Sequence, residues 1–146
     1  MTHATALFIA SLLIAGGCAS MSRQRLEDIK PNRVYHKTYP EVFDAVKMYS
    51  LKEGFRLDRY GEEAGRVIGH KNTTSSTEGK QMSSIAETAM MVVMNLKMRK
   101  VSGTETEILV NFSFENGHVV VSREEEAILL DCYGTFFDFM QESVGS

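Results

Sequence analysis

The sequence predicts a two-layer α+β domain, in which an antiparallel sheet of about five to six strands carries two helices on one face. Two segments repeat apolar residues at helical spacing, and each begins with a capping box. Between them, shorter segments alternate apolar and polar residues, which is typical of strands with one buried face. Short glycine-containing turns separate most of these segments, so neighbouring strands are expected to run antiparallel in the order β-α-β-β-β-β-β-α.

The first strand and helix are predicted around a capping box. Residues 34–38 are strand-like, and Thr38 with Glu41 forms the box at the helix start. Apolar residues at i, i+3, i+4 and i+7 then mark the buried stripe: Val42, Ala45, Val46 and Tyr49. Gly54 is suited to end the helix in a left-handed conformation.

Two strands and a long loop are expected next. Residues 55–60 and 66–71 alternate in character and are joined by a turn over residues 61–65. The following residues, 73–87, contain few apolar side chains. We interpret them as a loop, which is either functional or a surface excursion.

Residues 89–99 are ambiguous when considered alone. Met, Leu and Lys favour a helix, and Ser84 with Glu87 would cap it. Residues 105–114, however, alternate strictly, and a hairpin between the two segments joins their apolar faces. We therefore predict a hairpin with Gly103 in the left-handed position of a three-residue turn.

The register of this hairpin is predicted from its charges. Lys97 would lie opposite Glu107 and Arg99 opposite Glu105, and each such pair is worth roughly 0.2–1 kcal/mol. On the apolar face the same register opposes Leu96 to Ile108, Met94 to Val110 and Val92 to Phe112.

A further strand and a long helix are expected at the end of the chain. The dipeptide 116–117 (Asn-Gly) predicts a type I′ turn into a short strand over residues 118–121. Ser122 and Glu125 form the second capping box, and the helix should extend to about residue 142. Its apolar stripe is Leu129, Tyr133, Phe136, Phe137 and Met140.

The beginning of the chain resembles a bacterial lipoprotein signal. Residues 6–15 are an apolar run, too short to span a bilayer as a helix, and small residues lead from it to Cys18. The resemblance implies that Cys18 carries a diacylglyceryl group and becomes the mature N-terminus. Ala19 and Ser20 follow without an aspartate, which favours the outer membrane, facing the periplasm. The alternative is a soluble protein that starts at Met21.

The domain organisation follows from this leader. We expect a signal peptide over residues 1–17, a lipid-attached tether over 18–33 and a single α+β domain over 34–146. Within the tether, a short helical turn could instead dock against the domain. The net charge of −3 excludes the class of basic nucleic-acid binders. If Cys18 is acylated, Cys132 is left as a single thiol, which we expect to be buried.

The sequence predicts no catalytic or metal centre. Met90, Met94 and Met98 share one strand face, and thioethers suit Cu(I). Residues four apart on a strand are separated by about 13 Å, too far to share one ion, so we interpret them as core residues. The histidines lack metal-ligand spacing, and the acidic run over 124–126 suits a helix start. We expect no enzymatic activity and no cofactor.

The domain resembles small bacterial envelope lipoproteins with a helix-grip-like domain. The resemblance is carried by residues 38–46 (TYPEVFDAV), 54–55 (GF) and 65–68 (GRVI), with Tyr133 and Phe136-Phe137 in the final helix. Domains of the C component of the outer-membrane β-barrel assembly machinery are of this kind. The resemblance implies an adaptor or binding domain and brings no catalytic residues with it.

Two functions remain open at this point. The first is a membrane-anchored module that binds another envelope protein through a sheet face, an edge strand or the loop over 73–87. The second is a carrier of a lipid or other small apolar ligand between the sheet and the C-terminal helix. We name Met94, Phe112 and Phe137 as candidate contacts for a ligand or partner.

Overall fold

The computed structural model describes residues 25–73 and 90–145. The predicted leader, Cys18 and nearly all of the predicted loop over 73–87 lie outside these residues. The strands are β1 (Asn32–Tyr35), β2 (Arg56–Gly61), β3 (Arg66–Thr73), β4 (Met90–Ser102) and β5 (Glu105–Phe114); the α-helices are α1 (Tyr39–Lys52) and α2 (Arg123–Val144), and the short 3-10 turns are η1 (Leu26–Asp28) and η2 (Glu115–Gly117).

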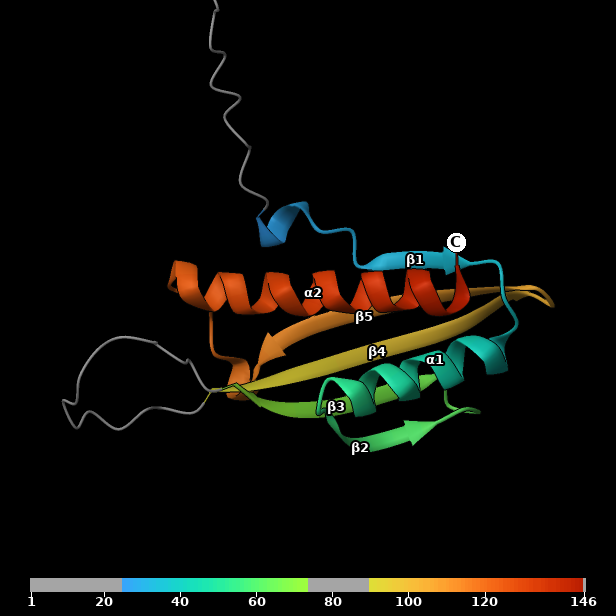
Figure 1. The fold of residues 1–146 in the computed structure, drawn as a ribbon. Coiled ribbons are helices and arrows are strands. Elements are labelled where there is room, and N and C mark those ends of the chain that lie inside the picture. Colours follow the sequence, from blue (N-terminus) through green and yellow to red (C-terminus); the bar gives the residue numbers. More distant parts are fainter. Residues whose placement is uncertain (1–24, 74–89, 146) are drawn as a thin grey trace, which may run out of the picture.

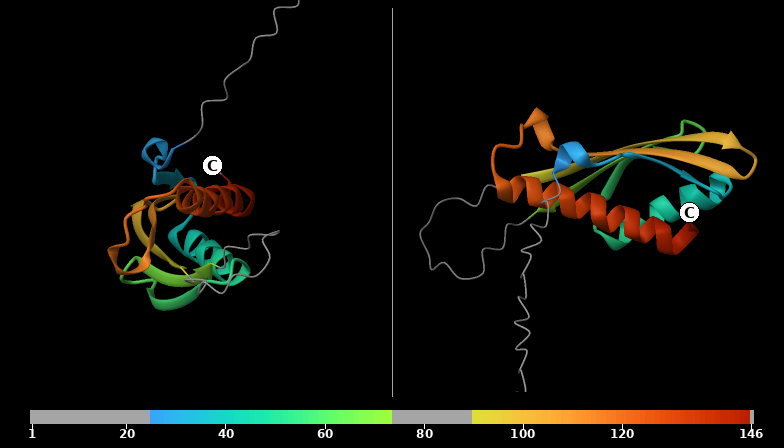
Figure 2. Two further views of the ribbon diagram at one scale, coloured as in Figure 1. Left: turned by 90° about the vertical axis from the view of Figure 1, so that its left-hand side faces the viewer. Right: turned by 90° about the horizontal axis from the view of Figure 1, so that it is seen from above.

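The fold is the predicted two-layer α+β arrangement. The five strands form one sheet in the order β1-β5-β4-β3-β2, and every neighbouring pair is antiparallel. Both helices lie on the same side of this sheet, as the two views at right angles show (Figure 1, Figure 2). The other face of the sheet is left open by the described elements.

Both helices begin at the predicted capping boxes. The amide of Thr38 donates to the Glu41 carboxylate at 3.0 Å. At α2 both hydrogen bonds of the capping box form: the amide of Glu125 donates to Ser122 Oγ at 3.1 Å, and the amide of Ser122 donates to the Glu125 carboxylate at 3.3 Å. Gly54 follows α1 with a φ of 76°, as the C-terminal signal predicted.

The β4–β5 hairpin is confirmed, but its predicted register is wrong by two residues. Leu96 lies opposite Val110 and Arg99 lies opposite Glu107. The strands extend to Ser102 and Glu105, which pair with each other across a tighter turn, and the pairing is irregular just before them. Gly103 is not in the predicted left-handed conformation.

The predicted strand over residues 118–121 is wrong. Asn116 and Gly117 both have the positive φ of a type I′ turn, but they lie in η2 and the chain then leaves the sheet. Part of the β5 edge that this strand would have used is occupied, because the amide of Phe112 donates to the Tyr133 hydroxyl at 3.2 Å. Val121 is 79% exposed and its amide donates to Glu125, so this segment forms the approach to α2.

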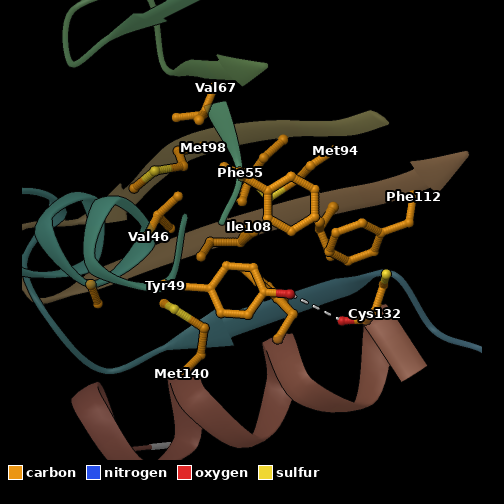
Figure 3. Close-up of a cluster of buried hydrophobic side chains, with 14 of the residues drawn as sticks. Val46, Tyr49, Phe55, Val67, Met94, Met98, Ile108, Phe112, Cys132 and Met140 are labelled. Carbon is orange, nitrogen blue, oxygen red and sulfur yellow. Dashed lines mark hydrogen bonds between the residues drawn. The ribbon is translucent and has the colours of Figure 1, made fainter. Parts of the chain in front are cut away.

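The core fills the space between the sheet and the helices (Figure 3). The predicted helical stripes are buried in it, apart from Phe137, which is half-buried. Met94 and Met98 are buried there among Val67, Ile108 and Phe112, which agrees with their interpretation as core residues. Leu26 and Ile29, around η1, pack against the edge of this core.

Candidate interaction surface on the open face of the sheet

A row of outward-pointing side chains crosses four strands of the open face. Asn32 pairs with Leu109, Leu109 with Lys97, and Lys97 with Arg66, so these four residues lie side by side from β1 to β3. Side chains alternate along a strand, and the next residues inward, such as Leu96 and Val67, are fully buried on the helix side. The row therefore belongs to the face that the helices do not cover.

A depression of about 520 Å³ lies along this row. Its lining residues come from the β2–β3 turn and from β1, β3, β4 and β5: Asn32, Ala64, Gly65, Arg66, Lys97, Met98, Arg99, Glu107 and Leu109. Gly65 forms part of its wall, and the amide of Met98 donates to the Gly65 carbonyl at 2.7 Å.

The acidic side chains on the strands of this face are each partnered within the domain. Glu107 accepts hydrogen bonds from Asn32 at 2.9 Å and from Arg99 Nε at 2.7 Å, and these bonds hold the pKa of its carboxyl below the usual range. Glu105 contacts His36 Nδ1 at 2.9 Å, and Asp58 contacts His70.

Two basic side chains of the face, unlike these acidic ones, have no partner of opposite charge among the described residues. Lys97 and Arg66 are exposed and oppose each other directly across β3 and β4, and neither forms an ion pair with the described residues. Like charges in directly opposed positions destabilise a sheet. The pair is therefore a local concentration of positive charge that would be stabilised by a bound anionic group.

The structure does not bring the three predicted contact residues together on a surface. Met94 and Phe112 are buried in the core, with no more than 3% of their surface exposed. Phe137 is half-buried on α2, where the Arg33 guanidinium lies 4.3 Å from its ring centre. Phe137 also lines a shallow depression of about 350 Å³ beside Gly134.

The Cys132 thiol and the Glu125 carboxylate are two further reactive groups, and the fold accounts for the position of each. Burial raises the pKa of the Cys132 thiol to about 11, which keeps it protonated at neutral pH. Glu125 is held by Ser122, Val121 and His118 at the start of α2. In residues 25–73 and 90–145, no three His, Cys, Asp or Glu side chains are grouped so that they could hold a metal ion. None of the helices described is long and apolar enough to cross a membrane.

The pair formed by Lys97 and Arg66 is not among the residues that the sequence predicted for a binding site. The expected hairpin register assigned Glu107 to Lys97, whereas the structure gives Glu107 to Arg99. The opposition of Arg66 and Lys97 comes from the register of β3 with β4, which no pattern within either strand specifies. No protein-family model matches the chain, and no curated protein matches it significantly.

Proposed function

We propose that this chain is an outer-membrane lipoprotein of the cell envelope, which faces the periplasm and acts as a non-enzymatic interaction module. The observation that carries the proposal is the open sheet face, with its depression and with two basic side chains that form no ion pair with the described residues. The described helices cover only one face of this sheet (Figure 1). An open face that bears both apolar and charged side chains suits the docking of another protein. Leu109, which is 41% exposed in the middle of the row, contributes apolar area.

The membrane anchor rests on the sequence. The apolar run over residues 6–15 and the small residues before Cys18 support lipid attachment at that cysteine. The resemblance to envelope lipoproteins with helix-grip-like domains leads to the same role. Since Cys132 is buried in the folded domain, Cys18 is the better candidate for modification.

The alternative is a carrier of a small apolar ligand between the sheet and α2. The interior there is occupied by protein side chains, because Met94, Phe112, Phe136 and Met140 are each at most 3% exposed. Ring contacts of 5.0–6.1 Å connect Tyr49, Phe112 and Phe136 across this space. We therefore favour the interaction module over the carrier.

Site-specific photocrosslinking in the native envelope tests the module. A photoreactive amino acid at Asn95 or Leu109 on the open face is expected to crosslink to one reproducible envelope protein. The matched control positions are Leu51 on α1 and Ala127 on α2, which are exposed on the helix side. Crosslinks from the control positions alone, or from neither face, would contradict docking through the sheet.

Lipid attachment is tested by metabolic labelling with a radioactive fatty acid. The wild-type chain is expected to incorporate label into the protein, and Cys18→Ser is expected to lose the label and to be released from the membrane fraction. Cys132→Ser is the matched control, since it removes the other cysteine and should keep both label and location. Equal labelling of Cys18→Ser and wild type would rule out the anchor.

A further inference from the structure

We infer that the open sheet face binds an acidic, extended segment of its partner protein, with carboxylates seated at Lys97 and Arg66. This inference rests on the proposed interaction module and specifies the chemistry of its ligand. The acidic and basic side chains of this face differ: Glu105, Glu107 and Asp58 have partners, whereas the opposed basic pair forms no ion pair with the described residues.

A further basic side chain extends the pair. Arg59 on β2 lies opposite Ile68 on β3, and Ile68 is two residues from Arg66 on the same face of that strand. Arg59 is exposed and likewise forms no ion pair with the described residues. The positive charge therefore continues from β4 across β3 to the edge strand, while half-buried Ile68 and exposed Leu109 supply apolar contacts beside it.

The dimensions of the row suit a short stretch of extended chain. Its four residues, from Asn32 to Arg66, are separated by three strand spacings of about 4.8 Å, or roughly 14 Å in all. About four to five extended residues span that distance. Carboxylates accept charge-assisted hydrogen bonds from Lys and Arg, and these are among the stronger polar contacts available at a protein surface.

A protein segment fits this face better than a membrane surface does. The basic side chains border a depression, whereas a bilayer offers a broad surface that cannot enter one. Faces that rest on membranes commonly present Trp or Tyr at the headgroup level. The outward positions of β3, β4 and β5 hold no Trp, Tyr or Phe.

The test measures binding of a fluorescent octapeptide of alternating glutamate and serine to the full chain, purified from membranes in non-ionic detergent. Fluorescence anisotropy at low salt is expected to show saturable binding that weakens as salt is raised. Lys97→Gln and Arg66→Gln are each expected to weaken it about tenfold or more. The matched peptide of alternating glutamine and serine should not bind.

Arg123→Gln is the matched control variant, because Arg123 is an exposed basic residue at the start of α2. It should leave peptide affinity unchanged, and an equal loss in this variant would show that only net charge matters and would overturn the inference. Thermal unfolding gives a second reading. Removal of one of two opposed like charges should raise the Tm of Lys97→Gln by about 1–5 °C, so its loss of binding is not a loss of fold.

Two further measurements separate other occupants from the proposed one. Binding to phosphatidylglycerol vesicles that depends on Lys97 and Arg66, without peptide binding, would overturn the inference in favour of a membrane surface. Self-association that Lys97→Gln abolishes in sedimentation velocity would overturn it in favour of a second copy. If peptide binding fails while open-face crosslinks to an envelope protein persist, this inference falls and the interaction module stands; if the crosslinks are also absent, both fall.

Discussion

Replacement of Gly65 by alanine is expected to lower the free energy of unfolding by about 2–5 kcal/mol. Two costs add at this position. Gly65 has a φ of 61°, a backbone conformation that residues with a Cβ atom adopt only with strain. A Cβ atom would also lie 2.6 Å from the Met98 carbonyl oxygen, so the β2–β3 turn would have to move away from β4. Urea denaturation followed by circular dichroism measures the loss.

Gly54→Ala is the matched control for this substitution. Gly54 has a similar φ of 76°, but no atom lies within 4 Å of a Cβ built on it. Its substitution should therefore cost only the backbone term, about 1–2 kcal/mol. The difference between the two variants isolates the contact of the turn with β4. Equal losses in both would show that the close approach at Gly65 contributes nothing to stability.

The helices could be predicted because their signals are local. A capping box requires two side chains three residues apart, and both boxes form as hydrogen bonds in the structure. The apolar stripes likewise follow from one repeat within one element. The two-layer fold class then followed, since helices with one apolar face need a sheet face to cover it.

The hairpin register could not be fixed in the same way. A shift of two residues keeps every side chain on its face, so the alternation that identified β4 and β5 cannot distinguish the two registers. The turn decided the outcome, because Ser102 pairs with Glu105 and leaves only two residues between the strands. The register also sets the charges of the open face, because Glu107 pairs with Arg99 and Lys97 lies opposite Arg66.

The false strand over residues 118–121 has a different cause. The Asn-Gly turn signal was correct in its backbone conformation, but a hairpin also needs a free strand edge. Tyr133 of α2, distant in the sequence, donates to Asn111 and accepts from the Phe112 amide at that edge. A contact between residues on different elements is not visible in the pattern of either one.

The candidate surface likewise depends on contacts between residues of different elements. No single strand segment shows that Lys97 and Arg66 are opposed, since the pairing arises from the register of β3 with β4. The predicted contacts were instead selected as large apolar residues. Two of them, Met94 and Phe112, are in the core because strands with one buried face place such residues there.

Truncation of Phe136 to alanine is expected to lower the free energy of unfolding by about 3–5 kcal/mol. Phe136 is fully buried, and its ring lies edge-on to Tyr49 of α1 at 5.0 Å and to Phe112 of β5 at 6.1 Å. The side chain therefore joins both helices to the sheet, and its removal leaves a cavity that the neighbouring rings cannot fill. Urea denaturation of the variant and the wild type measures this loss.

Phe137→Ala is the matched control, because it removes the same group from the next residue of α2. Phe137 is half-buried and borders a surface depression, so its loss should cost about 1–2 kcal/mol. The comparison also bears on the carrier alternative. A protein with a ligand cavity beside Phe136 would already lack packing there, and the two truncations would then cost similar amounts. A loss at Phe136 that exceeds the loss at Phe137 by about 2 kcal/mol or more is the result expected of a filled core, and it would count against a carrier of an apolar ligand.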